Sequence, residues 1–127
     1  MVVVRSFSVS EVSTAEALRK LSEQIVNGPS QVRLVFTFYG CTHDDDAIQA
    51  FVQARFPDAA RIGGTSCGGV MSEEGILGPD SIGFLTIEDP EGDYGVAASP
   101  LGLNAADTAE ALLHEALANA GCTGQLP

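Results

Sequence analysis

A run of glycines, hydroxyls and a thiol at residues 63–69 is the part of the sequence best suited to contact a small molecule. The run reads Gly-Gly-Thr-Ser-Cys-Gly-Gly and follows a short apolar segment, residues 59–62. Glycine lets a backbone or a ligand approach closely, and amides, hydroxyls and a thiol together form a polar wall. The structural alternative is a bend where two strands pack closely, with the thiol as a small buried apolar group. The candidate ligand-binding residues from this run are Gly63, Gly64, Thr65, Ser66, Cys67 and Gly68.

A second candidate segment follows the clearest predicted strand, residues 32–39. That strand is apolar at most positions, which favours a central strand covered on two faces. Ligands in open α/β sheets collect at the carboxyl ends of strands, so Tyr39 and Cys41 join the candidate set. Cys41 and His43 are also weak candidates for haem ligation, because their Cys-x-His spacing defines no metal site by itself.

A cysteine-dependent reaction is the alternative chemistry. Cys67 would be the nucleophile, and His43 or His114 would be its base. The sequence has no Gly-x-Ser-x-Gly elbow and no established Cys/His signature. His114 follows Glu110 by four residues, which is typical of a surface pair on a helix. We therefore expect a protein that is not an enzyme, with a cysteine enzyme or redox sensor as the alternative.

The charge balance excludes several partners. The formal net charge is −11, from seventeen acidic and six scattered basic residues. Binding to nucleic acid or to an anionic membrane needs clustered cations, so we expect neither. Three cysteines cannot all pair within one chain, and they have neither CxxC nor zinc-site spacing. Residues 1–5 do not resemble a signal peptide, and no apolar run is long enough for a membrane span, so we expect a cytoplasmic protein with reduced thiols.

Local patterns predict the helices. Ser13 and Glu16 have the spacing of a capping box, and residues 27–29, Asn-Gly-Pro, should end the helix that follows. Asp44, Asp45 and Asp46 should open a second helix, where acidic side chains favour the helix dipole; a metal site is the less favoured interpretation. Asn104 should cap a third helix that ends at Gly121. The predicted apolar stripes comprise Leu18, Leu21 and Ile25; Ile48, Phe51, Val52 and Phe56; and Ala109, Leu112, Leu113, Ala116 and Leu117.

The remaining segments predict strands. Residues 2–7 and 61–66 read as strands, and residues 81–87 and 94–98 read as a hairpin with a polar loop. The order is β-α-β-α-β-β-β-α, which predicts a single α/β domain over residues 1–127, with an α+β arrangement as the alternative. We expect a mixed parallel and antiparallel sheet flanked by about three helices.

Four segments in order resemble the N-terminal domain of the FIST family. They are Leu34–Phe38, the Ala-Arg-Phe-Pro of residues 54–57, the Ile-Gly-Gly-Thr-Ser-Cys-Gly-Gly-Val of residues 62–70, and residues 80–87. The family counterparts are an apolar strand, a helix closing in Arg-Phe-Pro, a glycine-rich segment and a "gsvgvlal"-like strand. FIST domains are predicted intracellular sensory domains of bacterial signalling proteins and of an F-box protein.

The resemblance implies a function. It points to a non-catalytic intracellular domain that senses a small ligand, such as an amino acid or small carboxylate, and signals to an output protein. The chain resembles the first portion of the family domain, so we expect an uncovered sheet edge or face and a homo-oligomer. No cofactor is expected. A haem-binding gas sensor and a ligand-free oligomeric assembly module complete the alternatives.

Overall fold

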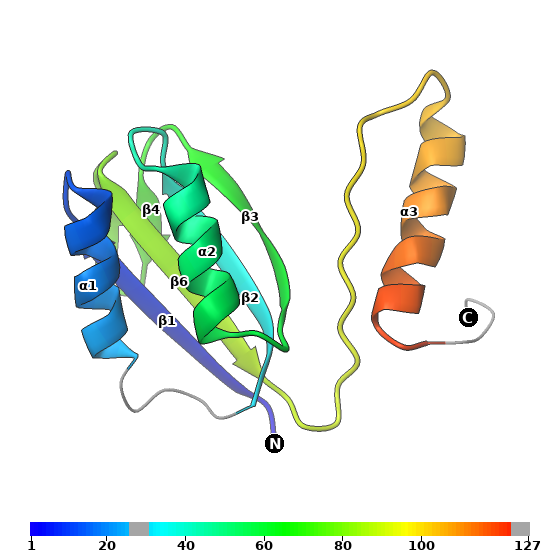
Figure 1. Cartoon of the computed structure of the whole chain (residues 1–127), viewed down its shortest axis with the longest axis horizontal. Coiled ribbons are helices and arrows are strands. Elements are labelled where there is room, and N and C mark those ends of the chain that lie inside the picture. The colour runs from blue at the N-terminus through cyan, green and yellow to red at the C-terminus, as the bar shows by residue number, and fades with distance from the viewer. Residues whose placement is uncertain (26–30, 123–127) are drawn as a thin grey trace. The chain divides into compact units, whose positions relative to one another are not determined.

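The computed structural model describes residues 1–25 and 31–122 (Figure 1). Contacts divide the chain into an N-terminal unit, residues 1–90, and a C-terminal unit, residues 91–127. Each is described by itself, and the expectation of a single domain stays a prediction. In chain order the elements are β1 (Val3–Ser10), α1 (Thr14–Gln24), β2 (Val32–Gly40), α2 (Asp45–Arg55), β3 (Ala60–Ser66), β4 (Val70–Ser72), β5 (Gly75–Leu77), β6 (Ser81–Glu88) and α3 (Ala105–Asn119).

The N-terminal unit is built on a four-stranded mixed sheet. Its strand order is β1-β6-β2-β3, and β4 and β5 form a separate two-stranded hairpin. Strand β6 pairs antiparallel with both β1 and β2, whereas β2 and β3 are parallel. The predicted α/β class and mixed sheet are therefore confirmed. The predicted turn at residues 72–75 joins β4 to β5, although the sequence analysis gave neither strand.

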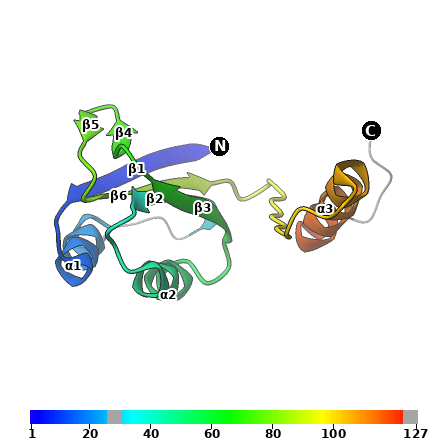
Figure 2. The same ribbon diagram turned by 90° about the horizontal axis from the view of Figure 1, so that it is seen from above.

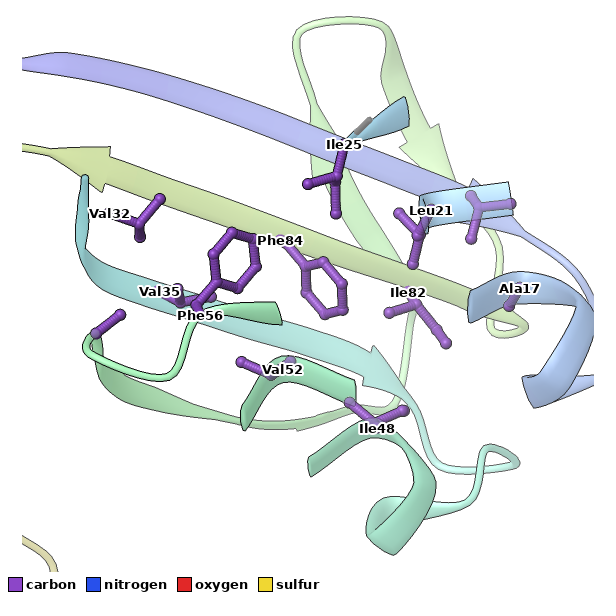
Figure 3. Packing of buried hydrophobic residues seen from close by; sticks show 12 residues of the cluster. Ala17, Leu21, Ile25, Val32, Val35, Ile48, Val52, Phe56, Ile82 and Phe84 are labelled. Carbon is purple, nitrogen blue, oxygen red and sulfur yellow. The ribbon is translucent and has the colours of Figure 1, made fainter. Parts of the chain in front are cut away.

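Helices α1 and α2 lie side by side on one face of this sheet (Figure 2). Their apolar stripes pack on alternate residues of β2 and β6, as the helical spacing predicted (Figure 3). Phe84 of β6 is 2% exposed and stacks on Phe51 of α2, with 5.9 Å between ring centroids. The core comprises Val9, Ala17, Leu21, Ile25, Val32, Val35, Ile48, Val52, Phe56, Ala59, Ile82 and Phe84.

Both helices begin at the predicted caps. The Ser13 hydroxyl accepts a hydrogen bond from the Glu16 amide at 3.4 Å, and the Asp44 carboxylate accepts one from the Ala47 amide at 3.1 Å. Each cap satisfies an amide that the first helical turn leaves without a partner. The first helix ends at Ile25, and the predicted Asn-Gly-Pro stop at residues 27–29 lies outside the described residues.

The opposite face of the sheet, called the open face below, has no helix on it within residues 1–25 and 31–90. Only the β4–β5 hairpin lies on it, towards one end (Figure 2). Val70 contacts the sheet at Gly83, and the Ser6 hydroxyl donates to the Glu73 carboxylate at 2.6 Å. The prediction that residues 32–39 form a central strand is confirmed, but their coverage on two faces is wrong. Phe38, on the open face, is 47% exposed.

The C-terminal unit consists of an extended segment and α3. The Asn119 side-chain amide donates to the Val96 carbonyl at 2.9 Å, and this holds the segment beside the helix. The predicted return strand at residues 94–98 is wrong, because no strand forms there. Strand β6 already pairs on one edge with β1 and on the other with β2, so it has no edge left for a third strand. Asn104 caps α3 as predicted, but no residue of its apolar stripe is buried within this unit.

Candidate functional site

The candidate residues lie at the carboxyl ends of the parallel strands β2 and β3. Tyr39 pairs in register with Thr65, and Gly40 pairs with Ser66. The loops that follow these strands, residues 41–44 and 67–69, therefore leave the sheet at the same edge. This is the edge at which open α/β sheets bind ligands, as the sequence analysis assumed.

The sheet divides the candidate residues between its two faces. Neighbours in register share a face, and alternate residues point to opposite faces. Tyr39 and Thr65 therefore lie on the helix-covered face, whereas Gly64 and Ser66 lie on the open face. One small ligand cannot contact all of these side chains together. The period of a strand made this division predictable, but only the register shows which residues of β2 and β3 are paired.

Several residues of the glycine stretch have structural roles. A side chain at Gly63 would begin 1.8 Å from the Thr37 carbonyl oxygen, so only glycine fits there. Gly69 has φ of 111°, a conformation that favours glycine, and Ser66 donates its hydroxyl to the Gly69 carbonyl at 2.5 Å. Ser66 therefore stabilises the turn into β4, and its hydroxyl is already engaged.

Other members of the set are open to solvent. Thr65, Cys67 and Gly68 are exposed, and no atom lies within 4 Å of the position where a Gly68 side chain would begin. Cys41, at the end of the neighbouring strand, is exposed as well. These four residues remain accessible to a molecule at this edge.

Tyr39 is half-buried beside the start of α2. Burial raises the pKa of Tyr39, and a hydrogen bond to the Asp45 carboxylate and its negative charge raise that pKa further. The phenol is therefore a neutral donor at physiological pH. Tyr39, Asp45 and Thr65 together place a hydroxyl-lined, negatively charged group at this edge.

The acidic run at the start of α2 has the structural role that its position predicted. Asp44 is the N-cap, and Asp45 and Asp46 lie in the first turn. Negative side chains at this end of a helix interact favourably with its dipole. No group of three metal-ligating side chains occurs within residues 1–25 and 31–122.

His43 connects three segments of the N-terminal unit. It is 5% exposed, its Nε2 lies 2.9 Å from the Asp80 carbonyl, and its Nδ1 lies 3.0 Å from the Thr14 hydroxyl. A carbonyl only accepts, so Nε2 carries the proton and Nδ1 accepts from Thr14. The Asp44 amide donates to the same hydroxyl at 3.0 Å. These bonds tie the start of α1 and the turn before β6 to the loop before α2.

These contacts decide the role of His43. Both ring nitrogens already have partners, so neither is free to ligate haem iron or to take a proton from Cys67. The sequence analysis missed Thr14 and Asp80 as its partners. No local signal marks them, because they lie 29 and 37 residues away along the chain.

Replacing Thr14 with valine tests this connection. We expect Thr14→Val to lower the free energy of unfolding by about 1–3 kcal/mol, because a buried ring nitrogen and an amide lose their partner. Urea unfolding gives the free energy, and nitrogen-15 NMR of the imidazole reports the lost bond at Nδ1. Thr42→Val is the matched control, because the Thr42 hydroxyl donates to the Asp80 carboxylate at an exposed position. Equal losses in the two variants would contradict the role assigned to Thr14.

The other histidine and the thiols give no catalytic group. His114 lies 3.8 Å from the Glu110 carboxylate on an exposed face of α3, as the spacing predicted. Cys41, Cys67 and Cys122 are all free thiols. No histidine nitrogen among the described residues is placed to activate Cys67 within the N-terminal unit, since His43 is engaged and His114 belongs to the C-terminal unit. None of the described helices is both long enough and apolar enough to cross a membrane.

Comparison with known proteins gives no family. No protein-family model matches the chain. No curated protein matches it either. A crystal structure of cyanuric acid hydrolase from A. caulinodans is similar over 97% of this chain, with 14% sequence identity and a TM-score of 0.45. The chain spans 40% of that protein's chain. A similarity at that level carries no argument about function, and the resemblance to FIST domains stays a prediction.

Proposed function

We propose that the chain is a non-catalytic intracellular sensory domain that binds a small ligand at the carboxyl ends of β2 and β3. The observation that carries the proposal is the pairing of Tyr39 with Thr65 beside Asp45. It places two hydroxyls and a carboxylate next to the exposed turn at residues 67–68. As in FIST domains, the ligand's presence would be passed to an output protein, and the domain would act as a homo-oligomer in the cytoplasm.

The charges at this edge favour an amino acid over a simple carboxylate. The exposed turn at Cys67 and Gly68 offers backbone amides to a carboxylate, and the Thr65 hydroxyl is a further donor. Asp45 and its acidic neighbours repel a second negative group but attract an ammonium. A zwitterion fits both halves of this arrangement, with its carboxylate at the turn and its ammonium beside Asp45.

A thermal-shift screen of the whole chain tests the proposal. The probes are the common L-amino acids, and each hit is repeated with the amine that lacks its carboxylate and the hydroxy acid that lacks its ammonium. A ligand at one hundred times its dissociation constant adds about 2.7 kcal/mol of stability. We expect an amino acid to stabilise the parent, and both truncated analogues to do so far less.

Two variants locate the site. Thr65→Val and Tyr39→Phe remove the paired hydroxyls, and each should abolish most of the ligand-induced shift while the free protein stays folded. Thr42→Val removes an exposed hydroxyl from the neighbouring loop and should leave the shift unchanged. If no amino acid shifts the parent, or if the shift survives in both site variants, the proposed function is wrong.

A further inference from the structure

The open face of the sheet carries three rows of uncharged side chains. Each row takes one residue from each of β1, β6, β2 and β3, because neighbours in register share a face. Val4, Phe38 and Ile62 are 54%, 47% and 46% exposed, so the face is far from covered. In that strand order the rows are Ser8, Gly83, Phe38 and Gly64; Ser6, Leu85, Phe36 and Ile62; and Val4, Ile87, Leu34 and Ala60.

The first row contains a projection beside a depression. Phe38 stands between Gly83 of β6 and Gly64 of β3. Val70 of the hairpin fills the space over Gly83, whereas no atom lies within 4 Å of the position where a Gly64 side chain would begin. An exposed aromatic ring and an empty space of one side chain therefore lie next to each other on the same face.

We propose that a second copy of this chain binds to the open face, with Phe38 of each copy seated over Gly64 of the other. A two-fold interface brings the same patch of two subunits together, so each patch must carry both a projection and a matching depression. The face has both, on adjacent strands. Two sheets stacked in this way lie about 10 Å apart, with their inner side chains interdigitated. This inference rests on the self-association proposed above but not on the ligand.

The size of the face suits a modest dimer. Four strands and three rows cover roughly 20 Å by 20 Å of sheet, from the ordinary spacings of strands and residues. Two copies then cover roughly 800 Å² before side-chain relief is counted, which lies near the 1,000 Å² or so that a specific interface needs. We therefore expect association that depends on protein concentration.

The charges separate a second copy from a basic partner. The twelve residues of the three rows include no Asp, Glu, Lys or Arg, while the chain carries a net charge of −11. Two copies repel one another through the rest of their surfaces, and salt screens that repulsion. Added salt should therefore strengthen the dimer, whereas it would weaken binding to a cationic partner.

Sedimentation equilibrium of the whole chain, without ligand and at low and high salt, tests the proposal. We expect a monomer–dimer equilibrium in the parent that tightens with salt. Phe38→Ser removes the projection and Gly64→Val fills the depression, and each should weaken dimerisation about tenfold or more, as loss of a central contact does. Gly64→Val meets no atom within the subunit and places a favoured residue type in a strand, so its fold should persist.

Controls and outcomes decide between the alternatives. Met71→Ser changes an apolar side chain that is 78% exposed on the hairpin and should leave dimerisation unchanged. Circular dichroism shows that each variant is folded. A parent that stays monomeric at every concentration, a dimer that salt weakens, or a dimer that persists in folded Phe38→Ser and Gly64→Val overturns the proposal. Because ligand binding is measured separately through Thr65 and Tyr39, either proposal can fail without the other.

Discussion

Phe84→Ala should lower the free energy of unfolding by about 3–5 kcal/mol, the usual cost of removing a buried aromatic ring. Phe84 is 2% exposed, lies on the helix-covered face of β6, and stacks on Phe51 of α2. Its loss removes buried apolar area and leaves a cavity between the sheet and the helix. Domains of this size have about 5–15 kcal/mol of stability, so this one change should remove a large part of it.

Urea unfolding followed by circular dichroism measures this loss, and Leu85→Ala is the matched control. Leu85 is the next residue of β6, but it lies on the open face and is half-buried. We expect its replacement to cost less than half as much as Phe84→Ala. Comparable costs would mean that the core does not lie between the sheet and the two helices.

Gly40→Ala should lower the free energy of unfolding by about 3 kcal/mol, at the upper end of the usual cost of overpacking. A side chain at Gly40 would begin 1.5 Å from the Pro79 carbonyl oxygen and 2.7 Å from its carbon. Backbone cannot swing aside as a flexible side chain can, so the turn before β6 would have to move. That turn carries the Asp80 carbonyl, which accepts from His43 at 2.9 Å and from the Glu11 amide at 3.0 Å.

Urea unfolding again gives the free energy, and hydrogen exchange at the Glu11 amide reports on the turn. We expect faster exchange of that amide in Gly40→Ala. Gly68→Ala is the control, because a side chain there meets nothing within 4 Å. It should be neutral or slightly stabilising, since alanine restricts the unfolded chain. If Gly40→Ala is as stable as Gly68→Ala, the close approach of residues 40 and 79 is wrong.

The candidate site was only partly predictable. The sequence located the ends of two strands, and these do meet at one edge of the sheet. It could not show that Thr65 faces the helices with Tyr39 while Ser66 faces away, because that depends on how β2 and β3 are paired. It also offered His43 as a ligand or base, whereas the folded chain satisfies both of its ring nitrogens.

The sequence by itself determined the features that depend on neighbours along the chain. Caps at Ser13, Asp44 and Asn104 and the apolar stripes of α1 and α2 follow from residues three or four positions apart, so local patterns predict them. Only the tertiary structure decided the strand partners. Backbone hydrogen bonding is the same for any strand, so β6 could pair with a neighbour in sequence or with β1 and β2. It lies between β1 and β2 because that arrangement buries Ile82 and Phe84 beneath both helices.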